Sequence, residues 1–170
     1  MDKDERTRLQ ELERGKEDTD PKALACYGVL LRRPPQHADQ MVLRFVEGRP
    51  VSAVTIDFLI ACCDHLATQS LTALVLIWDN ASWHKSQMVR IWLRGHNQTV
   101  KQTGKGVRIL PCFLPSKSPW LNPIEPKWMH GKRNVSEADR ILSADELEAR
   151  VCTYYGTPLQ PHLVIPEKVA

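Results

Sequence analysis

The sequence lacks any long apolar run. No stretch approaches the roughly 18 consecutive apolar residues that a membrane-spanning helix needs. Residues 1–22 are polar and have no apolar segment of the kind found in a secretory signal peptide. We therefore expect a cytoplasmic protein without a membrane partner.

The sequence also lacks cysteines at the spacing of a zinc site. Its five cysteines are odd in number, include the adjacent pair Cys62 and Cys63, and form no Cys-x-x-Cys motif. A structural zinc site and a disulfide framework are both disfavoured by this pattern. We expect reduced and mostly buried thiols.

Acidic residues are scarce in the middle of the chain. Between His84 and Ser136 there are ten Lys or Arg and a single acid, Glu125. A basic segment of this kind suits a polyanionic partner such as DNA, because cations that neutralise phosphates release condensed counterions. The alternative is a solvated basic face without a partner. Both interpretations stay open on charge alone.

The length of 170 residues and a hydrophobic content of 42% fit one domain. Residues 1–20 are charged and predict a disordered tail, 21–156 a folded domain, and the Pro-rich 157–170 a second tail. The order of periodic segments predicts an α/β domain with a mixed sheet. The expected strands are 23–31, 41–46, 74–78 and 107–114, the first two forming a hairpin, and the expected helices are 52–67, one around 88–93, one after Pro126, and 143–155 with a capping box.

Two carboxylates stand out by position. Asp79 directly follows the apolar run 74–78, and ligands gather at the carboxyl ends of strands in open α/β sheets. The bland alternative is an Asp that turns the chain, and for Glu125 it is a salt-bridged glutamate at a helix start. If the fold brings the two together, they form an oxygen-rich site suited to Mg²⁺ or Mn²⁺. Two such ions can assist in-line displacement at a phosphate.

Two sequence motifs that contain these carboxylates resemble the DDE catalytic domain of transposases, in the bacterial insertion-sequence branch of the mariner superfamily. Between Asp79 of the first motif and Glu125 of the second there are 45 residues. The motifs read Leu-Ile-Trp-Asp79-Asn80-Ala-Ser-Trp-His84 and Lys117-Ser-Pro-Trp-Leu-Asn122-Pro-Ile-Glu125-Pro-Lys-Trp.

The resemblance implies an RNase H-like fold, with a mixed central sheet flanked by helices, that cuts and joins DNA with divalent metal ions. It implies that Asp79 and Glu125 are catalytic metal ligands. Asn80, His84 and Asn122 would support them or face DNA, although His84 could instead simply pack beside the strand end. The residues expected to bind DNA are Lys85, Lys117, Lys127, Lys132 and Arg133. The tryptophans are interpreted as packing residues rather than base-stacking platforms.

One departure from the family pattern concerns its first catalytic Asp, which lies on the opening strand of the fold. The acids of the polar tail (Asp2, Asp4, Asp18 and Asp20) follow no apolar run, so the role is assigned to none of them. We expect an N-terminally truncated domain that lacks the opening strand, located in the bacterial cytoplasm with the nucleoid. Its partners would be DNA and either an N-terminal transposase segment or another copy. The alternatives are a noncatalytic DNA-binding or dimerising regulator, and a metal-independent structural protein in which Asp79 and Glu125 lie far apart.

Overall fold

The computed structural model describes residues 24–33, 38–48, 51–116, 118–136 and 141–165. The polar segment 1–20 lies outside these ranges, and so do residues 166–170 of the Pro-rich end. Among the described residues, no helix is both long and apolar enough to cross a membrane. The described elements mix strands and helices, as the sequence pattern predicted.

The hairpin comprises strand β1 (Ala25–Leu31) and strand β2 (Gln40–Glu47), which pair antiparallel. This confirms the predicted hairpin. A short strand, β5 (Leu163–Val164), adds to the other edge of β2 in parallel. The segment predicted as a C-terminal tail therefore contributes to a sheet, and Leu163 is buried beside β2.

The second sheet contains strand β3 (Ala73–Trp78) and strand β4 (Arg108–Phe113), which pair in parallel. The sequence predicted one mixed sheet, but the described strands form two sheets. Apolar periodicity reports which residues are buried and not which edges pair, so the division could not be seen in it. The apolar run of β3 is buried on one face only, because Val75 and Ile77 are 59% and 52% exposed.

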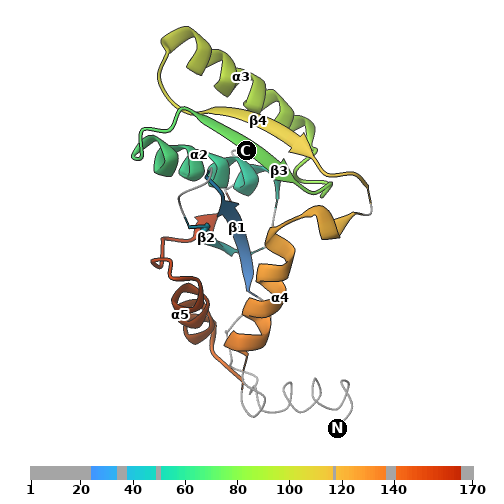
Figure 1. Cartoon of the computed structure of the whole chain (residues 1–170), viewed down its shortest axis with the longest axis vertical. Helices are drawn as coiled ribbons and strands as arrows, with labels where there is room; N and C mark the ends of the chain where they lie inside the picture. The colour runs from blue at the N-terminus through green and yellow to red at the C-terminus, as the bar shows by residue number, and fades with distance from the viewer. Residues whose placement is uncertain (1–23, 34–37, 49–50, 117, 137–140, 166–170) are drawn as a thin grey trace.

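Helix α2 (Ser52–Ala67) packs against both sheets. Its Phe58 contacts the hairpin cluster, and its Leu59 joins the cluster of β3 and β4. Its N-cap residue is Val51, which provides no side-chain cap, and the Thr55 hydroxyl donates to the Val51 carbonyl at 3.2 Å. Helix α2 thus lies between the two sheets (Figure 1).

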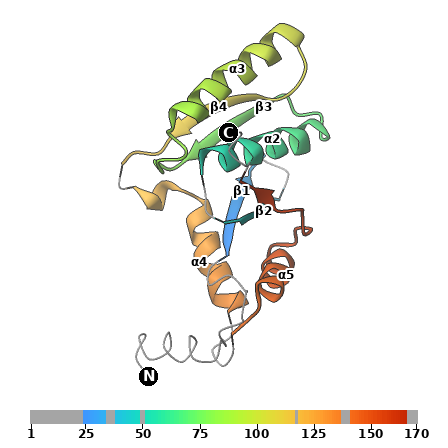
Figure 2. The ribbon, with the colours of Figure 1, turned by 180° about the vertical axis from the view of Figure 1, so that it is seen from behind.

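The remaining helices occupy the two ends of the molecule. Helix α3 (Gln87–Thr103) covers β3 and β4 through Val89 and Leu93. Helix α4 (Ile124–Val135) and helix α5 (Ala144–Tyr155) lie beside the hairpin at the opposite end, as both views show (Figures 1 and 2). The capping box predicted for α5 is present.

Candidate functional site

Asp79 immediately follows β3, and its side chain is 56% exposed. Its Oδ1 accepts a hydrogen bond from the backbone N–H of Ala81 at 2.9 Å. The same oxygen lies 2.9 Å from Nδ1 of His84. The Oδ1 of Asp79 therefore helps to turn the chain after the strand. The second oxygen, Oδ2, makes no hydrogen bond or ion pair with a described residue.

His84 is held against Asp79 by aromatic neighbours. Its ring stacks on Trp78 with centroids 4.9 Å apart, and Trp83 and Tyr27 meet it edge-on. Burial lowers the pKa of His84 from its ordinary value, although the nearby carboxylate of Asp79 acts in the opposite direction. A neutral imidazole with the proton on Nδ1 donates to Asp79 and fixes the orientation of that carboxylate.

Asn80 joins the ends of the two parallel strands. Its Nδ2 donates to the carbonyl of Leu114 at 2.6 Å, while the N–H of Leu114 donates to the carbonyl of Trp78 at 2.9 Å. The side-chain amide of Asn80 therefore donates to the backbone after β4. This bond and the bond between Leu114 and Trp78 hold the end of β3, which Asp79 follows.

Glu125 lies in the first turn of α4, where the helix N-terminus favours negative charge. Asn122 Nδ2 donates to its Oε1 at 3.3 Å, and the Asn122 carbonyl accepts from the Glu125 N–H at 3.1 Å. Asn122 therefore holds Glu125 much as His84 holds Asp79. The Glu125 Oε2 makes no hydrogen bond with a described residue.

Close packing fixes the position of α4. A Cβ on Gly28 of β1 would collide with the indole of Trp128, so only glycine allows this approach. Gly131 lies under the ring of Tyr155 in α5, and the Tyr155 hydroxyl donates to the carbonyl of Lys127 at 2.7 Å. Glu125 is therefore carried by a helix that is packed on two sides.

Both carboxylates border one cavity of about 1040 Å³. It lies between β1 and β3, and it is bordered by Asp79, His84, Asn122 and Glu125. Asn80 does not border it. Among the described residues, no three His, Cys, Asp or Glu side chains are grouped closely enough to hold a metal ion. The cavity thus offers two carboxylates with uncommitted oxygens, a donor set that fits a hard divalent cation retaining several waters.

The basic residues expected to bind DNA are spread over more than one face. Lys85 is exposed in the loop after Asp79, and Lys127, Lys132 and Arg133 are exposed on α4. Lys132 follows Glu125 by about two helical turns and so lies on the same side of α4, whereas Arg133 points elsewhere. Lys117 lies outside the described residues.

The matched family settles what kind of domain this is. The family described as DDE superfamily endonuclease matches residues 3–148, which is most of the chain. The chain belongs to that family. A search of curated proteins found no match. The DDE domain type supports a transposase-like nuclease, and such nucleases generally use divalent metal ions.

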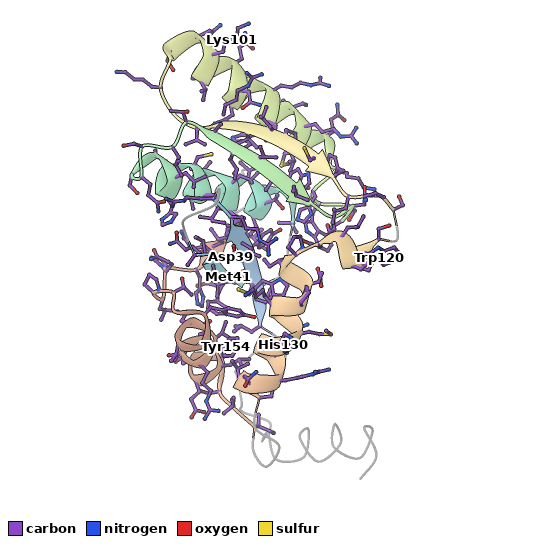
Figure 3. All side chains as sticks on the ribbon, viewed as in Figure 1. Asp39, Met41, Lys101, Trp120, His130 and Tyr154 are labelled. Carbon is purple, nitrogen blue, oxygen red and sulfur yellow. The ribbon has the colours of Figure 1, made fainter. Side chains whose placement is uncertain are left out.

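The sequence did not indicate that Trp120 of the DDE domain is exposed. Its side chain is 74% exposed on the segment that leads into α4 (Figure 3), so it does not pack in a core. The signal available in the sequence was its position among prolines just before Asn122, where a large ring has few neighbours to cover it. An exposed indole beside a basic helix is suited to stacking on nucleic-acid bases.

Proposed function

We propose that this chain is the catalytic-domain portion of a DNA transposase, which cuts and joins insertion-sequence ends using Mg²⁺ or Mn²⁺. The observation that carries the proposal is the cavity bordered by both Asp79 and Glu125. A metal-independent structural role is less favoured, because it requires these carboxylates to be far apart. The two sequence motifs around these carboxylates favour a transposase of the bacterial insertion-sequence branch that is located with the nucleoid.

In this proposal, Asp79 and Glu125 hold the metal. When bound, the divalent ions supply activation of the attacking oxygen and stabilisation of the leaving oxygen at the phosphate. His84 keeps Asp79 in one orientation, and Asn122 does the same for Glu125. The exposed cations Lys85 and Lys132, with their neighbours, would hold the DNA backbone.

The chain is proposed to be incomplete when alone. Two carboxylates border the cavity, whereas the family resemblance implies three, the first on the opening strand of an RNase H-like fold. An N-terminal transposase segment, or association with another copy, would supply it.

A second candidate is a noncatalytic regulator that binds DNA or dimerises with intact transposase. It is supported by the exposed cations in the loop after Asp79 and on α4, which would bind DNA without a metal ion. Substitution of Asp79 or Glu125 would then leave DNA binding unchanged and remove no activity.

The deciding experiment measures cleavage and strand joining of element-end DNA with Mg²⁺ or Mn²⁺. The chain is assayed alone and together with the upstream-encoded segment, as wild type and as Asp79→Ala and Glu125→Ala. We expect cleavage only from the combination, and each substitution should lower it about a thousandfold or more, since several kcal/mol of charge stabilisation are lost.

The matched control is Asp64→Ala, which removes an exposed carboxylate on α2 that does not border the cavity. It should cleave like wild type. If every combination binds DNA and none cleaves, the regulator is the correct interpretation. If Asp79→Ala cleaves normally, the catalytic assignment is wrong.

A further inference from the structure

The short 3₁₀ turn η1 (Pro119–Leu121), which precedes α4, exposes two large apolar side chains that are adjacent in the sequence. Trp120 is 74% exposed and Leu121 is 50% exposed. All five tryptophans lie in the described ranges, and the other four are buried or half-buried. Two large apolar side chains exposed together on one turn indicate a contact surface rather than a chance exposure.

Hydrogen bonds and prolines hold the backbone of this turn. The N–H of Leu121 donates to the Ser118 carbonyl at 3.1 Å, and the N–H of Asn122 donates to the Pro119 carbonyl at 2.9 Å. Pro119 and Pro123 each fix one backbone dihedral angle. The backbone that carries the indole is therefore held in place before any ligand binds, which lowers the entropic cost of binding.

The turn is continuous with the residues that hold Glu125. Asn122, the next residue, donates to Glu125 Oε1 at 3.3 Å and borders the cavity that both carboxylates border. Trp120 itself does not border that cavity (Figure 3). Five residues span at most about 18 Å when fully extended, and a 3₁₀ turn shortens this distance. At about 3.4 Å per base step, the indole is within about five steps of a phosphate held at Glu125.

The charges around the turn favour DNA as the partner of the indole. Glu125 is the only acid among residues 114–136. Lys127 and Lys132 are exposed on α4. The centres of protein–protein interfaces are depleted in lysine, whereas sites for single-stranded nucleic acid combine cations with aromatic rings. A polyanion with flat apolar bases therefore matches this surface better than a second polypeptide does.

An indole can stack on a base only where the column of bases is interrupted. Inside a duplex, both faces of each base are covered by its neighbours, so a base must be unpaired or turned out before a protein ring reaches it. Apolar side chains inserted at a base step unstack it, and Leu121 is placed beside Trp120 for this role. A cut strand also ends in a base whose outer face is uncovered.

We propose that Trp120 stacks on an unpaired DNA base within about five nucleotides of the phosphate held at Asp79 and Glu125, with Leu121 filling the gap beside that base. The inference rests on the proposed function, because it takes DNA as the partner of the candidate site. It adds a contact to a base, whereas the lysines on α4 contact phosphates. The base is selected for being unpaired and not for its identity, since every base has a π-face.

The first test measures binding of the full chain to a duplex that has a single-stranded overhang of about five nucleotides, without metal. The matched probe has abasic sites throughout the same overhang, so it keeps every phosphate and loses only the bases. We expect Trp120→Ala to bind the normal overhang about tenfold more weakly than wild type. Both proteins should bind the abasic overhang equally. An equal loss on both probes, or no loss on either, would overturn the proposal.

Further substitutions separate stacking from apolar contact. Trp120→Phe keeps a ring and should retain most of the affinity, whereas Trp120→Leu keeps apolar area without a π-face and should not. Leu159→Ala removes another exposed apolar side chain, which lies between α5 and β5, and should bind both probes like wild type. Thermal unfolding should be the same for all variants, because the substituted side chains are exposed. If Trp120→Leu binds as well as Trp120→Phe, stacking is wrong.

Tryptophan fluorescence reports the contact directly, because Trp120 is the one exposed indole among the five tryptophans. The normal overhang should quench the fluorescence of the wild type, and the abasic overhang should not. This quenching should disappear in Trp120→Phe although that variant still binds. Quenching that depends on protein concentration in the absence of DNA would mean that a second copy covers Trp120, and the proposal would be wrong.

Single abasic sites along element-end DNA locate the base and separate this inference from the proposed function. Wild type should lose affinity at a position within about five nucleotides of the cut, and Trp120→Ala should lose nothing further there. Sensitivity only at more distant positions would contradict the placement. If the overhang results are as expected but no combination cleaves DNA, the base contact holds and the nuclease proposal fails. If DNA is cleaved but Trp120→Ala responds to the bases as wild type does, the nuclease proposal stands and this inference fails.

Discussion

The hairpin half of the molecule and the β3–β4 half differ in how completely they are covered. In the hairpin half, β2 buries Leu43 and Phe45 to 2% exposure, and helices α4 and α5 close around it. In the β3–β4 half, α2 and α3 cover one face, while Val75 and Ile77 remain exposed on the other. The β3–β4 sheet therefore leaves apolar side chains at the surface on the face that the two helices do not cover.

The comparison matters because each half contributes one carboxylate. Asp79 ends β3, and Glu125 begins α4, which packs on the hairpin. The site therefore forms where the two halves meet. The positions of its two carboxylates depend on the contacts that hold each half together.

The largest expected effect comes from Gly28→Val, which disrupts the contact between β1 and α4. The new side chain collides with Trp128 and Leu43, so we expect a loss of about 3 kcal/mol in the free energy of unfolding. Displacement of α4 should also abolish any cleavage that depends on Glu125. Denaturant unfolding and the DNA cleavage assay measure the two effects.

The control for that substitution is Gly95→Ala in the exposed part of α3, where an added Cβ meets nothing within 4 Å. It should stabilise the protein by about 0.5–1 kcal/mol, because alanine is the better helix former. Equal stability of wild type and Gly28→Val would show that α4 is not fixed by this contact.

A smaller effect is expected from Glu148→Ala, which tests how the hairpin half is closed. Glu148 is 4% exposed and lies 2.9 Å from Nε2 of His162, just before β5. Removing it leaves His162 without its buried partner and should cost about 2 kcal/mol. Glu47→Ala, which removes a more distant and exposed partner of His162 at 3.7 Å, should change stability by less than about 0.5 kcal/mol. Thermal unfolding of both variants gives the comparison.

A still smaller effect is expected from Lys132→Ala, which lies on the Glu125 side of α4. Loss of one phosphate contact should reduce the slope of log affinity against log salt by about 1. Lys101→Ala, at the far end of α3, is the matched substitution and should leave the slope unchanged (Figure 3). Titrations of element-end DNA at several salt concentrations measure this. Identical slopes for both variants and wild type would remove α4 from the DNA interface.

Thiol labelling is the smallest perturbation, because it compares the accessibility of one thiol in each half without a substitution. Burial raises the pKa of Cys62 to about 12, so this thiol stays protonated and unreactive up to strongly alkaline pH. Cys112 is exposed on β4. We expect a maleimide or Ellman reagent to modify Cys112 in the folded protein and Cys62 only after unfolding. Because the folded-state pKa of Cys62 is raised, its contribution to stability is present below pH 9 and is lost as the pH rises toward 12.

Much of the secondary structure could be predicted from the sequence because it is encoded locally. The Ser143 and Glu146 capping box and the run before Asp79 are examples. The split into two sheets could not be predicted, since edge pairing depends on residues distant in the chain. Val75 and Ile77 are apolar whether or not they are covered, so the run gave no sign of an open face. Strand β5 is too short for periodicity to reveal.

The residues of the candidate site could be predicted where they lie in the sequence motifs, but the partners that they gain through tertiary contacts could not. Asp79 and Glu125 lie in those motifs, and both border one cavity in the fold. The bond from Asn80 to the Leu114 carbonyl depends on the pairing of β3 with β4, so its partner was not visible in the sequence. Whether these residues are catalytic remains a prediction for the cleavage assay.

Helix α2 couples the unfolding of the two halves. Its neighbouring residues Cys62 and Cys63 face different clusters, so the helix is part of both cores at once. If either core opened alone, apolar residues of α2 would be exposed to water, and the same helix is needed to bury the other core. Amide protons deep in β2 and β4 should therefore exchange through one cooperative opening with a shared free energy, rather than as two independent units.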